Sequence, residues 1–359
     1  MTTRERLNKV LHWQKADKIP NVDFGYWDET IQLWHSQGLP KEVATNEDVE
    51  RYLGLDGVEI FLWFPVRNGL YPWFENKTLE THSNYKLIQT HEGNICRVPL
   101  VGESIPQYEK YVLETRADWE RLKAERLNFK DDSRIGDIPA VIEKSKQTGL
   151  PLRFDAGSLY GWLRNWMGVE NVSIAMMTER DWIEEMMDHF TEMTLYLIDK
   201  TLPHVQVDLA WWWEDMCFNK GPLISPRLFE ELMVPRYAKI TRHLKKYHVD
   251  VNILDCDGCI YELVPGWLKA GINCMFPLEA AHTNPRKLRE WYGRDVLLVG
   301  GVNKVELSKD RAAIDRELES LLPLIEAGGF VPCMDHRVPP DVSFENYLYY
   351  LEKKKRILG

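Results

Sequence analysis

From residue 150 onward, short apolar runs alternate with longer segments in which apolar residues recur every three or four positions. A short run of this kind is typical of a buried strand, and the longer period is typical of an amphipathic helix. Alternation of strand and helix indicates a parallel sheet with right-handed crossovers. Strands are expected at 150–155, 207–211 with an ending at 212–215, 249–254, 271–277, 295–299 and 329–332.

The segments between these strands carry signals that start and stop helices. Ser225 stands before Pro226, and Asn284 before Pro285, which places a capping side chain ahead of a proline in the first turn. Gly271 follows the end of another helical pattern, as a C-terminal glycine does. Helices are therefore expected at 180–202, 225–247, 260–270, 284–292 and 308–327, with a last one after the turn at 339–343.

The first third of the chain is less regular. Residues 18–25 and 57–63 supply two more strands, which brings the total to about eight, the number in a (β/α)8 TIM barrel. Two alternating runs within 85–100 predict a β-hairpin, read as an insertion at about 85–114 over the barrel mouth. The expected architecture is a single α/β TIM-barrel domain over residues 1–359.

A doubly wound open sheet is the rival fold. It would need a glycine-rich phosphate turn after its first strand, and neither 24–28 nor 299–302 has that spacing. A dinucleotide cofactor is therefore not expected.

The composition is that of a soluble globular protein, with 44% hydrophobic and 28% charged residues. A net charge of -10 argues against nucleic acid or an anionic membrane as partner. No apolar run approaches the roughly 20 residues of a membrane helix, and residues 1–11 do not resemble a signal peptide. We expect a cytoplasmic protein with a small-molecule substrate. The six cysteines do not form a disulfide framework in a chain of this length.

Ionisable side chains gather where the predicted strands end, which is where a barrel builds its active site. The residues concerned are Glu214, Asp215, Asp255, Asp257, Glu279, Cys333, Asp335, His336 and Arg337. Crowded carboxylates raise one another's pKa values and attract a proton or a cation. One of them could be a general acid or base, or two with a histidine could hold zinc, manganese or iron. The alternative is that they cap helices or pair with Arg337.

The candidate roles follow from these positions. Glu214, Asp257 and His336 are the expected catalytic residues, and Asp257, Glu279 and His336 are the expected metal ligands. A thiol site at Cys256-x-x-Cys259 is the weaker alternative, because it is only half of a zinc tetrathiolate. An aromatic pocket would suit an aryl group or a quaternary ammonium. The expected substrate-binding residues are Tyr160, Trp212, Trp213 and Arg337.

Several blocks resemble the uroporphyrinogen decarboxylase (URO-D) superfamily. They are 214–216, 221–226, 228–229, 254–260, 300–302 and 336–346. The resemblance covers most of the chain from about Leu150 onward and implies a single (β/α)8 barrel. The superfamily includes the decarboxylases of porphyrin synthesis and corrinoid-linked, cobalamin-dependent methyltransferases.

The departures separate the two branches. The decarboxylases carry an arginine-rich segment after the first strand and an aspartate after the next, whereas 23–28 has no arginine and 59–65 ends without an aspartate. The methyltransferases hold zinc through His-x-Cys and a later cysteine, and the matching positions here are Asp255, Asp257 and His336. Methylation of a thiol is therefore not expected, although a zinc ion there could polarise an ether or amine leaving group.

The resemblance implies a methyltransferase-like enzyme that moves a methyl group from a small methoxylated or methylated-amine donor to a corrinoid on a separate carrier protein. Uroporphyrinogen decarboxylation is the first alternative. A non-enzymatic barrel that binds a small ligand is the second.

Overall fold

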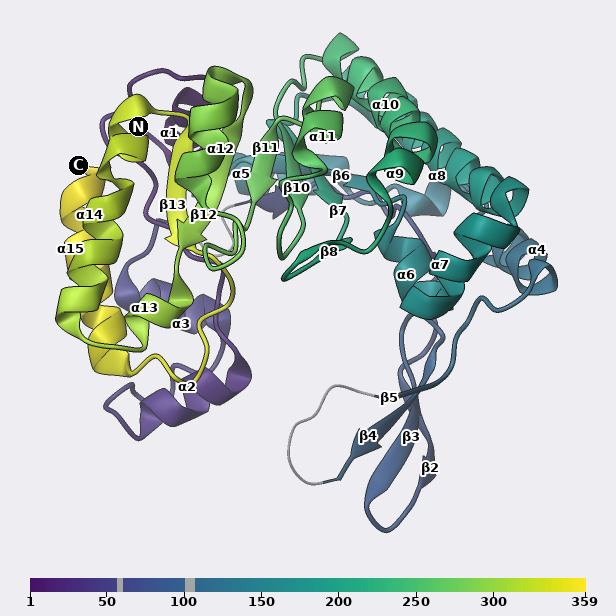
Figure 1. Cartoon of the computed structure of the whole chain (residues 1–359), viewed down its shortest axis with the longest axis horizontal. Coiled ribbons are helices and arrows are strands. Elements are labelled where there is room, and N and C mark those ends of the chain that lie inside the picture. The colour runs from purple at the N-terminus through teal and green to yellow at the C-terminus, as the bar shows by residue number, and fades with distance from the viewer. Residues whose placement is uncertain (57–60, 101–106) are drawn as a thin grey trace. The chain divides into compact units, whose positions relative to one another are not determined.

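The computed structural model describes residues 1–56, 61–100 and 107–359 and divides into two compact units (Figure 1). Unit 1 comprises Met1–Phe64, Asp137–Phe154 and Val205–Gly359. Unit 2 comprises Pro65–Gly136 and Asp155–His204.

Unit 1 is built on a curled parallel sheet of seven strands in the order β1-β6-β7-β10-β11-β12-β13. The strands are β1 (Leu62–Trp63), β6 (Leu152–Gly157), β7 (Leu209–Trp213), β10 (Asn252–Asp255), β11 (Cys274–Phe276), β12 (Leu297–Val302) and β13 (Phe330–Met334). Six of them lie within or beside the strands predicted after residue 150. The α/β class and the parallel sheet of a TIM-barrel-like fold are confirmed.

The first predicted strand is absent. Residues 18–25 form no strand, and their backbone groups bond instead to scattered partners: the N–H of Ile19 donates to the carbonyl of Leu358, and Asn21 accepts from Asp56. Pro20 has no N–H to give to a ladder, and only Tyr26 makes an isolated parallel bridge, to Val338. Residues 57–60 of the second predicted strand lie outside the described residues. Within the described chain the parallel sheet thus has seven strands rather than about eight.

Helices fill most of the remaining chain of unit 1. They are α1 (Thr3–Leu11), α2 (Asp28–His35), α3 (Asn46–Leu53), α5 (Ile138–Thr148), α9 (Pro226–Leu232), α10 (Val234–Lys246), α11 (Val264–Ala270), α12 (Pro285–Tyr292), α13 (Lys304–Leu307), α14 (Arg311–Ala327) and α15 (Phe344–Leu358). A short antiparallel pair, β8 (Cys217–Phe218) and β9 (Gly221–Pro222), follows β7. In Figure 1, α14 and α15 lie side by side.

The helix predicted at 225–247 is two helices, α9 and α10, with Met233 between them. Pro235 lies in the first turn of α10. A proline there loses no helical hydrogen bond, whereas within one continuous helix it would remove one. Proline therefore starts the second helix rather than interrupting the first.

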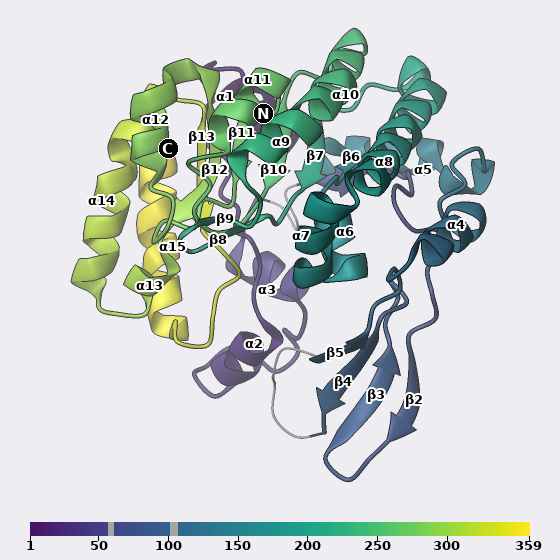
Figure 2. The same ribbon diagram turned by 45° about the vertical axis from the view of Figure 1, so that its right-hand side comes forward.

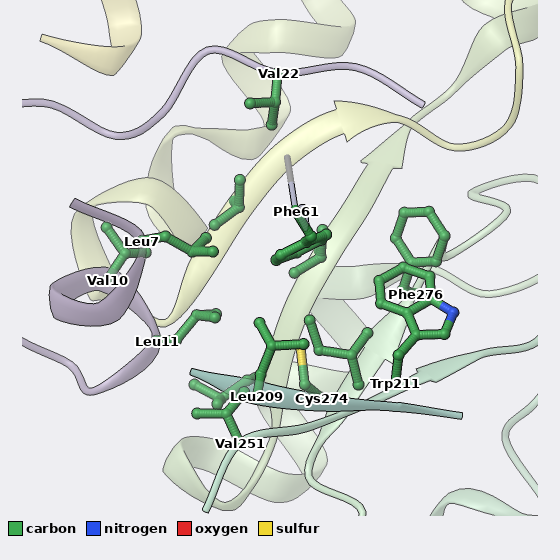
Figure 3. Close-up of a cluster of buried hydrophobic side chains, with 14 of the residues drawn as sticks. Leu7, Val10, Leu11, Val22, Phe61, Leu209, Trp211, Val251, Cys274 and Phe276 are labelled. Atoms are coloured by element: carbon green, nitrogen blue, oxygen red, sulfur yellow. The ribbon is translucent and has the colours of Figure 1, made fainter. Parts of the chain in front are cut away.

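Alternate strand residues point to one face and form the core of unit 1 (Figure 3). Leu209 and Trp211 of β7 lie in this cluster with Phe276 of β11, and α1 adds Leu7 and Leu11. Side chains two residues apart on a strand point to the same face. A polar side chain two residues beyond the last core residue of a strand therefore points inward at the carboxyl end of the sheet.

Unit 2 contains an antiparallel sheet and a group of helices (Figure 2). The sheet has the order β2 (Lys77–Thr81), β3 (Tyr85–Gln89), β4 (Ile95–Pro99), β5 (Gln107–Lys110), and the helices are α4 (Arg116–Glu125), α6 (Gly161–Met167), α7 (Val169–Thr178) and α8 (Arg180–Thr201). β3 and β4 pair across 90–94, where the sequence predicts a hairpin. Residues 101–106 of the predicted insertion lie outside the described residues.

Across the described residues, no helix combines the length and the apolar character needed to cross a membrane.

Candidate functional site

A cavity of about 310 Å³ opens at the carboxyl end of the sheet in unit 1. Aromatic rings form much of its wall, and charged groups of both signs reach it. The lining residues include Asp23, Phe24, Glu50, Phe61, Trp63, Arg153, Trp211, Asp255, Phe276 and Arg337.

Strand alternation explains why these side chains meet. Asp255 is two residues beyond Ile253, a core residue of β10, and so it points to the same inner face. Its register partners are Trp213 of β7 and Phe276 of β11. The rings of Trp211 and Phe276 lie 5.0 Å apart, centroid to centroid, and Figure 3 shows them at one side of the core. Asp255 therefore emerges among aromatic rings rather than in bulk water.

Arg153 of β6 is the most deeply buried cation in the cavity wall, with 8% of its surface exposed. Its guanidinium carbon lies 3.4 Å from the ring centroid of Trp63, 4.6 Å from that of Trp211 and 5.5 Å from that of Phe61. The negative faces of aromatic rings attract a guanidinium at such distances, and the attraction grows as water is removed. The three rings therefore help to keep a charge stable where water is scarce.

Burial raises the pKa of the Asp255 carboxyl well above its ordinary value. The neighbouring charges of Asp257 and Asp215 raise it further, while Arg153 and the hydrogen bond from Trp211 act in the opposite direction. Removal of water disfavours the charged form of a carboxyl group, and nearby negative charge does the same. Asp255 is thus set to carry a proton at a pH where an exposed aspartate has lost it.

Asp23, a second carboxylate in the cavity wall, has a contrasting environment. Its side chain is fully buried and lies 3.3 Å from Nζ of Lys354, which is also fully buried. It accepts hydrogen bonds from the hydroxyls of Tyr347, at 2.8 Å, and Tyr350, at 3.1 Å, and from the N–H of Met334, at 2.7 Å. A buried carboxylate with this many donors is fully compensated. Asp23 ties α15 to the segment before α2.

A separate cluster surrounds Lys304, at the start of α13. Its Nζ lies 2.7 Å from Oε1 of Glu279 and 3.9 Å from Oδ1 of Asp335. Oε2 of Glu279 accepts the N–H of Gly258 at 2.9 Å. Burial alone would raise the pKa of Glu279, but the ion pair with Lys304 and this N–H outweigh it, and the pKa is lowered. For the almost fully buried Asp335, burial prevails and raises the pKa to about 6.

His336 and Asp257 complete this cluster. Nε2 of His336 lies 3.7 Å from Oδ2 of Asp257, and the ring stacks on Trp27 at 5.7 Å between centroids. Burial lowers the pKa of His336, and the charge of Lys304 lowers it further. The imidazole is therefore neutral at neutral pH. The structure brings together Asp257, Glu279 and His336, as the sequence predicts, but around a lysine.

These three side chains do not fit a metal ion. Lys304 already supplies a positive charge 2.7 Å from the Glu279 carboxylate. Within the part of the chain that the structure describes, no group of three or more His, Cys, Asp or Glu side chains could hold a metal. We therefore assign no metal-dependent step to this cluster.

Two other predicted residues lie away from the cavity wall of unit 1. Glu214 is fully buried, and its charge acts on Tyr237 of α10, whose pKa is raised first by burial. Trp212 is also fully buried, packs edge-to-face on Tyr237, and donates from Nε1 to Oδ1 of Asn252 at 3.2 Å. Both point to the helix side because they alternate with Trp211 and Trp213. Trp211 is the tryptophan of this run that lines the cavity.

The remaining expected residues have mixed positions. Trp213 is half-buried at the end of β7 and is not among the residues that line the cavity. Tyr160 is buried in unit 2, just before α6. Arg337 lines the cavity, with its guanidinium carbon 5.6 Å from the centroid of the Trp27 ring.

Arg153 is one of the cavity residues that the sequence does not single out. Its signal was an arginine inside an otherwise apolar strand, Leu150-Pro-Leu-Arg-Phe. A buried strand admits a cation only where something compensates for lost hydration. That compensation comes partly from Trp63 and Trp211, on strands that are separate in the sequence.

Comparison with known proteins agrees with this fold. Residues 95–356 match the family model of uroporphyrinogen decarboxylase (URO-D). The solved structure of a methyltransferase from Methanosarcina mazei aligns over 100% of both chains, with a TM-score of 0.59 and 14% sequence identity, a likeness that shows the fold alone. Among curated proteins, none matches. Because the family match spans most of its length, the chain belongs to the uroporphyrinogen decarboxylase (URO-D) family.

Proposed function

We propose that this protein is a methyltransferase-like enzyme on a TIM barrel, which takes a methyl group from a small methoxylated aromatic donor. The acceptor is a reduced corrinoid carried by a partner protein. The observation that carries the proposal is the position of Asp255, whose pKa burial raises, among the rings of Trp211 and Phe276 in a cavity of about 310 Å³. The methyltransferase from Methanosarcina mazei supports it as a protein of the same fold.

The charge of the cavity favours a methoxylated donor over a methylated amine. A quaternary ammonium would suit aromatic rings alone. Here the faces of Trp63 and Trp211 are already close to the guanidinium of Arg153, at 3.4 and 4.6 Å. A second cation in the same low-dielectric space would be repelled. A neutral or anionic aryl ether meets no such repulsion.

Asp255 supplies the proton that an ether needs. When the methyl group leaves to the corrinoid, the electron pair of the broken carbon–oxygen bond stays on the oxygen, which becomes a phenolate. Asp255 donates its proton to that oxygen, so the product leaves as a neutral phenol and the carboxylate is later reprotonated from water. General acid catalysis of this kind contributes about 10²–10⁴-fold. The rings of Trp211 and Phe276 hold the donor's ring and exclude water.

The cluster around Lys304 has a positioning role in this proposal. Glu279 accepts from the backbone of Gly258, and Asp335 accepts from the N–H groups of Ala280 and Lys304. These bonds join the chain segments that follow β10, β11, β12 and β13. They hold in place the turn through which Asp255 leaves its strand.

The test is methyl transfer with the purified full chain and free cob(I)alamin as acceptor. A methoxylated aromatic should convert cob(I)alamin to methylcobalamin, which absorbs differently, and should release the phenol. A methylated amine should give little conversion. Conversion with the amine but not the ether would overturn the choice of donor, and binding of both without conversion would leave a ligand-binding protein.

Uroporphyrinogen decarboxylation is the second candidate, favoured by the family name. Against it stands the charge of the wall, because the cations Arg153 and Arg337 share it with the buried carboxylates of Asp23 and Glu50. A substrate with many carboxylates needs an excess of cations around it. Coproporphyrinogen formed from uroporphyrinogen by the purified protein would replace the first proposal.

A further inference from the structure

Three cysteines follow β7 and β10, and the methyl transfer just described uses none of them. Cys217 and Cys256 are buried, and Cys259 is partly exposed. In the described segments of the chain, no cluster of three or more His, Cys, Asp or Glu side chains could hold a metal, so these thiols are not a metal site. A buried thiol is usually an inert apolar side chain unless a second thiol lies within its reach.

The chain segments that carry Cys217 and Cys256 are joined where both leave the sheet. β7 and β10 are adjacent parallel strands, and beyond the last paired residue of β7 the N–H of Glu214 donates to the carbonyl of Asp255 at 2.9 Å. Cys256 follows Asp255 directly. The chain beyond Glu214 continues into the short pair of β8 and β9, whose first residue is Cys217.

The same two segments meet again a few residues later. The N–H of Cys259 donates to the carbonyl of Phe218 at 2.9 Å. Gly258 lies so close that a Cβ atom there would be 2.7 Å from the carbonyl oxygen of Phe218. Cys217 and Cys256 therefore lie between two points at which the backbones of their segments are in contact.

The side chains of Cys217 and Cys256 are neighbours as well. Burial raises the pKa of Cys256 well above its ordinary value, and a hydrogen bond with the Cys217 thiol raises it further. The Sγ of Cys256 also donates to the carbonyl of Asp257 at 3.6 Å. Two thiols on segments held together in this way can form a disulfide with little movement of the backbone.

The other buried cysteine pair of unit 1 lacks this geometry. Cys274 lies on β11 and Cys333 on β13, and β12 separates the two strands in the sheet. Two strand spacings of about 4.8 Å put their backbones roughly 10 Å apart, whereas a disulfide needs Cα atoms within about 7 Å. Burial is common to both pairs, but only Cys217 and Cys256 lie on segments in contact.

We propose that Cys217 and Cys256 form a disulfide when the protein meets a peroxide, and that this bond switches off the site at Asp255. The sulfur–sulfur bond forms as both S–H bonds and the O–O bond of the peroxide break, and with hydrogen peroxide the products are two molecules of water. Burial disfavours the thiolate that attacks the peroxide, so the bond forms slowly. Reduction by a thiol reverses it.

The effect on the site follows from the position of Asp255, which directly precedes Cys256. A covalent bond brings the two sulfur atoms closer together than a hydrogen bond does, so the turn after β10 moves toward β8. A displacement of about 1 Å at a reacting group can cost about 10²-fold in rate. The switch rests on the proposed function, because it acts on the proton donor, whereas formation of the disulfide does not.

The experiment is peptide mapping of the full chain after treatment with hydrogen peroxide. Trypsin places Cys217 in the peptide 201–220, and it places Cys256 with Cys259 in the peptide 247–269. Mass spectrometry should find these two peptides joined, and dithiothreitol should separate them.

Serine variants identify the bonded thiols. Cys217→Ser should give no joined peptide. Cys259→Ser is the matched control, because it removes the other thiol of the peptide that holds Cys256, and it should give the joined peptide as the unaltered chain does. Cys274 and Cys333 should remain reduced in every sample. Circular dichroism shows whether each variant is folded, and the map of the unaltered chain decides the matter if Cys217→Ser is not.

The effect on turnover is measured after the peroxide has been removed by desalting, so that it does not oxidise the cob(I)alamin. Methyl transfer from a methoxylated aromatic should be about a hundredfold slower than before treatment. It should recover with dithiothreitol. Cys217→Ser should keep its rate after the same treatment.

The two proposals fail in different ways. Absence of the joined peptide from the unaltered chain, or its loss in Cys259→Ser, overturns the bond between Cys217 and Cys256. An equal loss of turnover in Cys217→Ser overturns the switch. A joined peptide in a chain that transfers no methyl group even before treatment overturns the methyltransferase proposal and leaves the disulfide standing.

Discussion

Two groups of charged side chains follow the strands of unit 1, and their electrostatics differ. Around Lys304, Glu279 is paired at 2.7 Å and has a lowered pKa. In the cavity, Asp255 is buried near Trp211, and its pKa is raised well above the ordinary value. Position at a strand end is common to both groups, so position alone does not identify a reactive residue. At Asp255 burial outweighs the opposing charge of Arg153, whereas at Glu279 the ion pair with Lys304 outweighs burial. A strongly shifted pKa of this kind is typical of catalytic groups.

The largest expected effect comes from removing the proton donor. Asp255→Asn keeps the shape of the side chain but transfers no proton, and should lower kcat for an aryl ether by about 10²–10⁴-fold. In the unaltered enzyme, activity should fall as pH rises through the raised pKa of Asp255, because only the protonated form donates. A pH–rate profile of methyl transfer measures both.

Asp257→Asn is the comparison for this variant, because Asp257 follows the same strand and its side chain is 35% exposed. It should lose much less activity. An equal loss from Asp257→Asn, or an unchanged pH profile in Asp255→Asn, would contradict the distinction between the two groups.

The next effect concerns the compensated carboxylate of the cavity wall. Lys354→Met leaves Asp23 buried without its cation, and loss of one partner of a buried pair costs about 3–5 kcal/mol of the free energy of unfolding. Urea unfolding measures the loss. The double variant Asp23→Asn with Lys354→Met should recover part of it, and no recovery would show that lysine packing rather than charge matters.

The cluster around Lys304 can be examined through pH. The pKa of Asp335 is raised from 3.8 to about 6 in the folded chain. Between these values the folded state holds a proton that the unfolded state has released, so stability falls as pH rises. The contribution amounts to roughly 3 kcal/mol. Asp335→Asn should flatten the fall in unfolding free energy over this pH window, and an unchanged slope would mean that other groups cause it.

The smallest effect separates two neighbouring tryptophans. Trp212→Phe loses the hydrogen bond to Asn252 and should cost about 1 kcal/mol of unfolding free energy, with methyl transfer unchanged. Trp211→Phe should raise KM for the aryl ether because Trp211 lines the cavity. If Trp212→Phe raised KM and Trp211→Phe lowered only the free energy of unfolding, the face of β7 assigned to the substrate would be wrong.

The strands after residue 150 could be predicted from the sequence. Each strand after residue 150 is an apolar run closed by glycine or polar residues, a local signal that survives packing. The segment 18–25 misled because Val22 and Phe24 alternate with polar residues as strand residues do, whereas Pro20 and the pairing of Asn21 with Asp56 prevent a ladder. Whether a segment joins a sheet depends on its partner strand, which the local sequence pattern does not show.

The location of the candidate site could be predicted from the sequence, but only some of its residues could. Asp257, Glu279 and His336 do meet, because strand ends of a parallel sheet lie at one edge. Lys304 could not be recognised as their cation, since nothing near it in the sequence is acidic except Glu306. The sequence does not show that Trp211 rather than Trp212 faces the cavity. Which residues of a strand point inward depends on the packing of both faces of the sheet.

The bonds from α15 to Asp23 have a consequence for synthesis on the ribosome. Lys354 and Asp23 are separated by most of the polypeptide, yet each is buried against the other. Until α15 has emerged from the exit tunnel, the aspartate at the cavity wall has no lysine and no tyrosine hydroxyls to neutralise it. A nascent chain halted earlier should therefore remain a client of chaperones rather than a slow enzyme.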